Sequence, residues 1–312
     1  DAVHHDLVPA LRRLREALAE KARQFDDVVK IARTHLMDAV PIRLGQEFSG
    51  YARQVENILT MLGAAVGWLC ELPIGGTAAG TGLNAPPSFA AEVCEVIAAR
   101  MELPFGEAAN HFEAQAAKDA VLFASACLRN VAITLGKIAS DIRLLASGPR
   151  CGLGELLLPA TQPGSSIMPG KVNPVICESV IQVACQVVGC DAAIAAGATG
   201  GVGSVLDLNV AMPMMAANLL AAVTLLAGAA RTFEEKCIRG LEADERRCRE
   251  LVEQSLAMVT ALAPRIGYDQ AAEIAHAAYR SGKTIRQVCL ERELLPVDEL
   301  EKLLDPRGQT GT

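Results

Sequence analysis

Aromatic side chains are scarce in this sequence. They make up 4% of the 312 residues, although 51% of all residues are hydrophobic. A core with so few large rings must be built from alanine, valine, leucine and isoleucine in many close contacts, which is typical of helix bundles. The composition therefore predicts a helical protein, and the chain is long enough to bury a large core.

An excess of positive charge is also missing, because the formal net charge is −7. Such a chain has no basic stripe that would bind a polyanion, so we expect no nucleic-acid partner. An anionic substrate would need a local positive pocket.

Metal-ligand and cofactor motifs are absent as well. The ten cysteines include no Cys-x-x-Cys pair and stand near no histidine cluster, which argues against a zinc site or a disulfide framework. No dinucleotide-binding fingerprint occurs either, so we expect neither a metal nor an organic cofactor. Reduced thiols and the lack of a signal-peptide pattern favour a cytoplasmic protein.

Apolar residues recur at helical spacing along most of the chain, as at Leu11, Leu14 and Leu18. One segment, 112–145, has only Gly136 as an internal breaker and would span roughly 50 Å at about 1.5 Å per residue. Pro213 is expected to kink another of the helices. The expected long helices are 7–28, 44–69, 112–145, 174–195 and 207–233.

Polar residues are expected to interrupt the apolar stretches well short of a membrane span, so we expect no membrane partner. Charged residues cluster in 242–247, and the helices expected after them are short. We therefore predict an all-α fold with two domains, a long-helix bundle in 1–240 and a small helical domain in 241–312.

The segment 164–174, with the sequence GSSIMPGKVNP, carries the densest set of reactive polar groups. Its glycines allow close ligand approach, and Lys171 adds a positive charge. Asn173 and Pro174 are expected to cap the following helix and occupy its first position, so that free amides and the helix dipole favour an anion. The alternative is a glycine-rich connection whose serines only cap a helix.

His35 is the other candidate for chemistry. It follows Thr34 and lies where Asp38, Pro41 and Gly45 interrupt two expected helices, so we expect a loop to hold it. The remaining histidines are expected at the surface or in packing contacts: His4, His5, His111 and His276.

The segment 164–174 resembles the signature of the fumarase/aspartase superfamily. The other matches fall in the family's order along nearly the whole chain: 33–41, 44–47, 75–84, 147–152 and 208–210. The resemblance implies the family's long-helix bundle and a homotetramer whose active sites are shared between subunits. It also implies a small dicarboxylate as the substrate.

The family's chemistry removes a proton next to a carboxylate, so catalysis must stabilise a dianionic aci-carboxylate. By resemblance, Ser165 is the catalytic base, and His35 acts with Glu178 as its acidic partner. The same resemblance places Thr34, Ser166, Lys171 and Asn173 in contact with substrate. The group that protonates the leaving hydroxyl or ammonia is not identified.

Three interpretations stay open. The segment 110–114 and Cys151 are more similar to fumarase, which eliminates water from malate, whereas 38–48 is at least as similar to aspartase, which releases ammonia from aspartate. Long apolar helices also suit a non-catalytic assembly module.

The sequence departs from the family's pattern at a few points. Met37 stands where glutamine is usual, and Asp207 stands where glutamate is usual. The family's N-terminal domain, with its Ser-Ser-Asn-like segment that binds a substrate carboxylate, has no counterpart in residues 1–312. Either the chain is a fragment, or the protein has this domain outside these residues. Residues 1–312 expressed alone are expected to assemble but to show little turnover.

Overall fold

The computed structural model describes residues 1–164 and 167–311 and divides the chain into two compact units. The bundle unit comprises residues 1–17, 52–143 and 160–239. The hairpin unit comprises residues 18–51, 144–159 and 240–312. The last crossing between the units falls after Arg239, but the hairpin unit also takes in two earlier segments. Residues 1–240 and 241–312 as separate domains remain a prediction.

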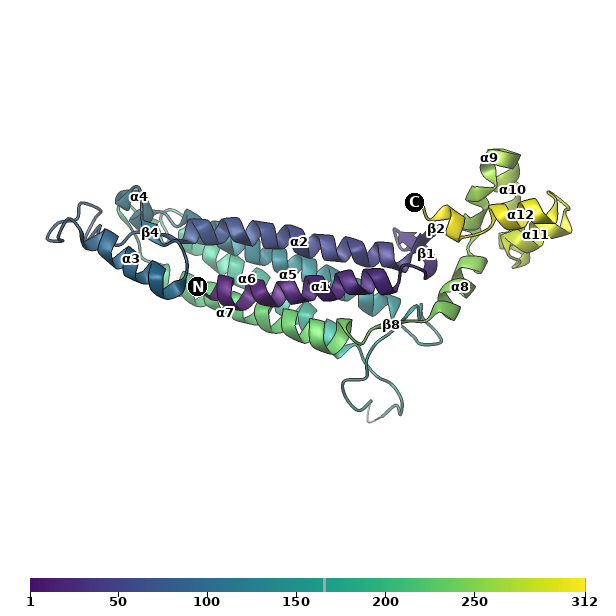
Figure 1. Ribbon diagram of the computed structural model, residues 1–312, viewed down its shortest axis with the longest axis horizontal. Coiled ribbons are helices and arrows are strands. Elements are labelled where there is room, and N and C mark those ends of the chain that lie inside the picture. Colours follow the sequence, from purple (N-terminus) through teal and green to yellow (C-terminus); the bar gives the residue numbers. More distant parts are fainter. Residues whose placement is uncertain (165–166, 312) are drawn as a thin grey trace. The chain divides into compact units, whose positions relative to one another are not determined.

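Long helices run side by side through the bundle unit (Figure 1). Their buried faces are built from aliphatic residues at helical spacing, such as Leu11 and Leu14 or Val131 and Leu135. The predicted helical bundle is therefore confirmed. The long helices are α1 (Val8–Gln24), α2 (Leu44–Leu69), α5 (Asp119–Leu145), α6 (Val175–Ala198) and α7 (Met212–Phe233), with π-helical turns η1 (Val3–Leu7) and η2 (Glu234–Ile238).

Shorter elements complete the bundle unit. Two pairs of very short strands form there, one parallel and one antiparallel. The elements are β3 (Glu71–Leu72) with β4 (Gly106–Glu107), β6 (Ser204–Val205) with β7 (Leu208–Asn209), and the helices α3 (Phe89–Met101) and α4 (His111–Ala116).

The hairpin unit is built on an antiparallel pair, β1 (Val29–Thr34) and β2 (Met37–Arg43). Ile31 of β1 packs into a core formed with the C-terminal helices. A second antiparallel pair joins β5 (Leu156–Leu157) to β8 (Glu242–Ala243). The remaining elements are α8 (Glu245–Gln254), η3 (Leu256–Ala261), α9 (Ala263–Ile266), α10 (Tyr268–Ser281), α11 (Ile285–Glu291), α12 (Val297–Leu303) and η4 (Arg307–Gln309).

Three predicted helix boundaries are wrong. The helix predicted over 7–28 ends at Gln24, and the chain then enters β1. The segment 112–145 breaks where Ala117 is extended, at ψ 162°, and the Lys118 ammonium there bonds the carbonyl of Ala114. Pro213 does not kink a helix, because α7 begins at Met212 and the proline occupies its first turn, where a missing N–H costs nothing.

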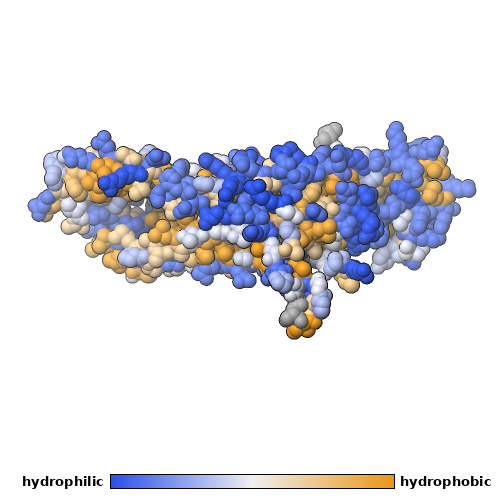
Figure 2. All heavy atoms as spheres, turned by 60° about the horizontal axis from the view of Figure 1, so that its bottom comes forward, coloured by the Kyte–Doolittle hydropathy of each residue, from blue (hydrophilic) through white to orange (hydrophobic). Residues whose placement is uncertain are grey.

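The apolar stretches in three long helices have fewer polar interruptions than predicted. Three segments are long and apolar enough to cross a membrane, judged by length and composition alone: 119–145, 175–198 and 212–238. The expectation that polar residues interrupt every apolar stretch short of a span is therefore wrong. Their most apolar windows are only 44%, 33% and 28% buried within this chain. Figure 2 shows the resulting apolar patches on the bundle surface.

A close backbone approach fixes the start of α2 in the hairpin unit. The Gly45 N–H donates to the carbonyl of Phe25, and a Cβ added at Gly45 would lie 2.3 Å from the oxygen of Ala22. Only glycine fits there without moving the backbone.

We predict that Gly45→Ala lowers the free energy of unfolding by about 1–3 kcal/mol or more, because the backbone must separate. Gly50→Ala on the same helix is the control, since nothing lies within 4 Å of its added Cβ, and it should stabilise by about 0.4–1 kcal/mol. Urea denaturation followed by circular dichroism measures both. Equal stability of Gly45→Ala and the parent would show that the approach is looser than described.

Candidate functional site

His35 lies in a two-residue turn between two strands, and not in a loop between helices as predicted. Thr34 at the end of β1 pairs with Met37 at the start of β2, so His35 and Leu36 alone form the connection. Sequence reasoning missed this hairpin because its turn carries neither asparagine nor glycine, the residues that usually mark such turns.

The turn is conformationally strained. His35 has φ 56° and Leu36 has φ 64°, so both occupy the left-handed region. For residues with a Cβ this region costs about 1–2 kcal/mol each. Strain of this kind persists only where the surroundings enforce it, and it gathers at functional sites. The turn therefore presents an exposed imidazole in one enforced backbone conformation.

The described residues of the segment 164–174 are irregular, as predicted, and Gly164 lies against Lys171. A Cβ added at Gly164 would lie 2.9 Å from the carbonyl oxygen of Lys171, so the two backbones are in close contact. Gly170 has φ 82°, and the Lys171 N–H donates to the carbonyl of Met168. The Lys171 side chain is exposed at this closed loop. Ser165 and Ser166 lie outside the described residues.

The cap predicted for the following helix is wrong in detail. Pro174 is the N-cap of α6, without a side-chain cap bond, and the helix begins at Val175. Asn173 is half-buried just before the helix, where its carbonyl accepts from the Val175 N–H at 2.9 Å. Glu178 lies in the first turn, as predicted, where its charge also suits the helix dipole.

A thiol contact packs this first turn against η2, the π-helical turn that follows α7. Cys177 and Cys237 are both buried, and their Sγ atoms are 3.9 Å apart. Their hydrogen bond lowers the pKa of Cys177 and raises the pKa of Cys237, which burial raises further. The backbone that carries Glu178 is thereby fixed to the bundle.

The candidate residues thus fall into two groups. Thr34 and His35 belong to the hairpin unit, whereas Lys171, Asn173 and Glu178 belong to the bundle unit. Each group lies within a short stretch of the sequence at the end of a regular element. Their assignment to one active site remains a prediction.

The glycine-rich segment 75–84 is a loop, as predicted, and α4 organises it. The carbonyl oxygen of Ile74 lies 2.9 Å from His111 Nε2, and the carbonyl of Thr77 accepts from the Gln115 amide at 3.0 Å. Asn110 caps α4 by accepting from two backbone amides. His111 therefore has a packing role within its unit, which agrees with the prediction.

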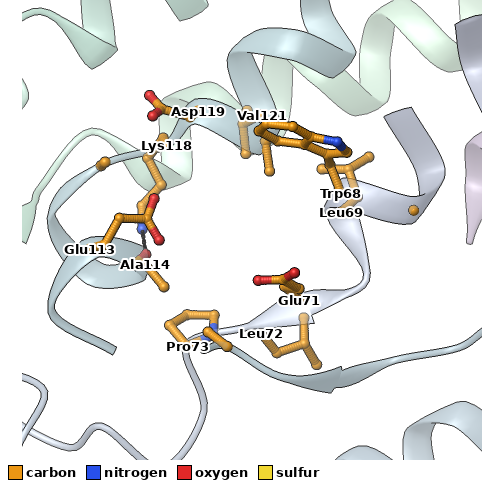
Figure 3. Close-up of a pocket in the computed structure, with 14 residues that line it drawn as sticks. Trp68, Leu69, Glu71, Leu72, Pro73, Glu113, Ala114, Lys118, Asp119 and Val121 are labelled. Carbon is orange, nitrogen blue, oxygen red and sulfur yellow. Dashed lines mark hydrogen bonds between the residues drawn. The ribbon is translucent and has the colours of Figure 1, made fainter. Parts of the chain in front are cut away.

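A cavity of about 700 Å³ lies beside α4 in the bundle unit (Figure 3). Its charged lining consists of Glu71, Glu113 and Asp119 against the single cation Lys118, with Trp68 at one side. Burial lowers the pKa of Lys118, which is the one positive charge against these three carboxylates in the lining. Three carboxylates would repel a dicarboxylate, so this cavity does not fit the predicted substrate.

Among the described residues, no group of three or more histidine, cysteine, aspartate or glutamate side chains could hold a metal ion. The expectation of a reaction without metal or organic cofactor stays a prediction.

Comparison with known proteins identifies the family to which the chain belongs. Residues 1–189 match the family described as "Lyase", and residues 258–310 match "Fumarase C C-terminus". The chain belongs to the fumarase/aspartase superfamily. It is 52% identical to fumarate hydratase class II from Mycobacterium tuberculosis, over 97% of this chain and 64% of that protein. Fumarate hydratase class II 2 from Bradyrhizobium diazoefficiens is 50% identical, over 98% of this chain and 64% of that protein.

A solved structure agrees with this membership. The class II fumarase from Schistosoma mansoni superposes with a TM-score of 0.93 at 38% identity, over 98% of this chain and 66% of that one. The chain therefore has the fold of the superfamily. It spans slightly less than two thirds of the length of both bacterial relatives.

Thiol reactivity tests the packing of the buried cysteines Cys237 and Cys248. Burial, with Glu155 nearby, raises the pKa of Cys248 to about 12, and Cys237 is also shifted upward. Because the thiolate is the nucleophile, we predict that iodoacetamide at pH 8 alkylates exposed Cys151 and spares Cys237 and Cys248 until denaturant is added. Peptide mass spectrometry reads the result, and rapid labelling of Cys237 in the native protein would contradict the packing described.

Proposed function

We propose that the full-length protein containing this chain interconverts malate and fumarate by reversible anti-elimination of water. The observation that carries the proposal is the closed loop that ends at Lys171, placed directly before the N-terminus of α6 and carrying the superfamily's signature sequence. The bacterial relatives named fumarate hydratase support malate, and not aspartate, as the substrate.

The proposed reaction needs positive charge where this loop supplies it. Removal of the proton on the carbon next to a carboxylate leaves a dianionic aci-carboxylate. The Lys171 ammonium and the positive end of the α6 dipole both stabilise that charge. Asn173 and Ser166 are proposed to donate hydrogen bonds to the same carboxylates.

Ser165 is proposed to accept the proton as an alkoxide. An ordinary hydroxyl is far too weak a base, so the base needs the positive field of the loop to hold its own negative charge. On the other side of the substrate, the carbon–oxygen bond breaks and the hydroxyl leaves as water with a proton from a general acid. Thr34 and His35 are proposed to contact the substrate, with Glu178 as the acidic partner of His35.

A homotetramer is proposed to assemble these groups. The helices α5, α6 and α7 leave much of their apolar surface uncovered within one chain. An apolar groove of about 430 Å³ runs between α5 and α6, lined by residues that include Ile133 and Val188. Burying such faces against other copies would place the His35 turn of one subunit beside the signature loop of another. Because the apolar helices also carry the buried Asp191, paired with Arg129, assembly is favoured over a membrane span.

The location remains a proposal. The cytoplasm is the proposed location, although one human relative at 46% identity is named as mitochondrial.

The catalytic assignment predicts that Ser165→Ala in the full-length protein lowers kcat for malate by about 10²–10⁴-fold, because the variant loses only the proton acceptor. Ser281→Ala is the control, since that hydroxyl bonds only carbonyls of its own helix. Malate, fumarate and aspartate are assayed in parallel by absorbance. Ammonia release from aspartate without malate turnover would overturn the proposed function, and near-parental kcat in Ser165→Ala would reassign the base.

The assembly predicts that Ile133→Arg, which places a charge in the α5–α6 groove, dissociates the protein and abolishes turnover. Leu290→Arg on α11 is the matched control, because Leu290 is also an exposed apolar residue on a helix. Light scattering gives the mass, and alkylation of Cys185, which lines the groove, should rise only in Ile133→Arg. A stable, active monomer would contradict a shared active site.

A further inference from the structure

A fully buried carboxylate lies beneath the stem of the His35 hairpin. Glu155 Oε2 is 2.8 Å from Arg33 Nη1 and 3.4 Å from Lys30 Nζ, and Lys30 is also 3.0 Å from Glu47. A buried charge is tolerated only when it is paired. The other oxygen, Oε1, has no hydrogen-bond partner in the described part of the chain. Arg33 and Lys30 therefore provide the compensation for this carboxylate.

The backbone of Glu155 is held on both sides. Its N–H donates to the carbonyl of Leu145 at 2.9 Å, and its carbonyl accepts from the Asp244 N–H at 3.0 Å. These contacts lie within the hairpin unit, at the start of the β5–β8 pair. The carboxylate is thus presented from a fixed point.

The superfamily segment 147–152 forms the loop that leads to this point. The carbonyl of Ser147 accepts from the Gly154 N–H at 2.9 Å, and the Ser147 hydroxyl accepts from the Leu153 N–H at 3.2 Å. A Cβ added at Gly152 would lie 2.5 Å from the Ser147 oxygen, so the loop closes tightly. The Arg247 guanidinium also donates to the Leu153 carbonyl. None of these contacts involves a residue that is proposed above to bind the substrate or to take part in catalysis.

The hairpin must be held in place at its stem, because few packing contacts hold its tip. Leu36 is 77% exposed, so packing does not hold the strained turn in place. The pairing register shifts between Ile31 and Arg33, where two residues of β2 oppose one of β1, and such a bulge bends and twists the strand. Arg33, two residues before His35, is the last residue of β1 that is tied to the buried core of its unit.

We propose that Glu155, delivered by the 147–152 loop, is a positioning residue that holds the His35 turn in its left-handed conformation through Arg33 and Lys30. The ion pair fixes the direction of the β1 stem, and the two-residue turn has no freedom to relax once its stem is fixed. The role of His35 in turnover rests on the proposed function, whereas the anchoring of the hairpin does not.

The first test replaces the pair by apolar side chains, Arg33→Met with Glu155→Leu. Such replacements of buried ion pairs commonly preserve stability, and Lys30 keeps Glu47 as a partner. We expect a folded protein in which the amides of residues 34–37 exchange with deuterium roughly tenfold faster or more. Arg43→Gln, which removes the pair with Asp26 at the other end of β2, is the matched control and should leave these amides unchanged.

A second variant covers failure of the double variant to fold. Arg33→Lys keeps the charge but lacks the planar fork and the reach of arginine, and it should loosen the same amides to a smaller extent. Parental exchange at residues 34–37 in each variant that folds would overturn the proposal. So would equal loosening in Arg43→Gln.

The second test couples the anchor to His35 in the full-length protein. We expect Arg33→Met with Glu155→Leu to lower kcat/KM for malate on the order of 10²-fold, the effect of misplacing a catalytic group by about 1 Å. In a His35→Asn background the same change should cost less than about threefold, because the group that it positions is gone. Equal losses in both backgrounds would overturn the positioning role. Absence of malate turnover in the parent protein would overturn the proposed function instead. Deuterium exchange would still show whether Glu155 anchors the hairpin.

Discussion

The apolar surface of α5, α6 and α7 is the constraint on which the rest of the structure depends. The most apolar window of each helix is at most 44% buried within the chain, and the uncovered remainder must be removed from water. Copies of the chain can do this by sharing one helical core. The ends of such a core are the places where polar loops from different copies can meet, and the signature loop and the His35 turn are both polar segments at the ends of regular elements.

The long helices were largely predictable because their signals are local and repeated. The segment 44–69 was predicted with its observed bounds, since an uninterrupted apolar period marks it. The break at Ala117 was not predictable, because no proline or glycine marks it and a lysine bond to a backbone carbonyl terminates the preceding helix. The β1–β2 hairpin was missed because Val28 continues the apolar stripe of α1 and the two-residue turn carries neither asparagine nor glycine.

The candidate site was predictable only where chemistry is concentrated in the sequence. Lys171 and Glu178 stand within one short segment, and the structure places them on a closed loop and the following helical turn. Glu155 carries no such signal, because a single glutamate in a sequence is usually a solvated surface charge. Its role emerges only when folding removes it from water and brings Arg33 within 2.8 Å. The Arg33–Glu155 contact joins residues that are 122 positions apart, so no local sequence pattern predicts it.

Deuterium incorporation tests proton transfer at the proposed site most directly. Fumarate is incubated with the full-length protein in D₂O, and the malate formed is analysed by proton NMR. Anti-addition with one positioned base predicts a single deuterium on the carbon next to the hydroxyl-bearing carbon, in one stereochemical position only. Absence of malate, or deuterium divided between both positions of that carbon, would contradict a single base acting opposite the leaving hydroxyl.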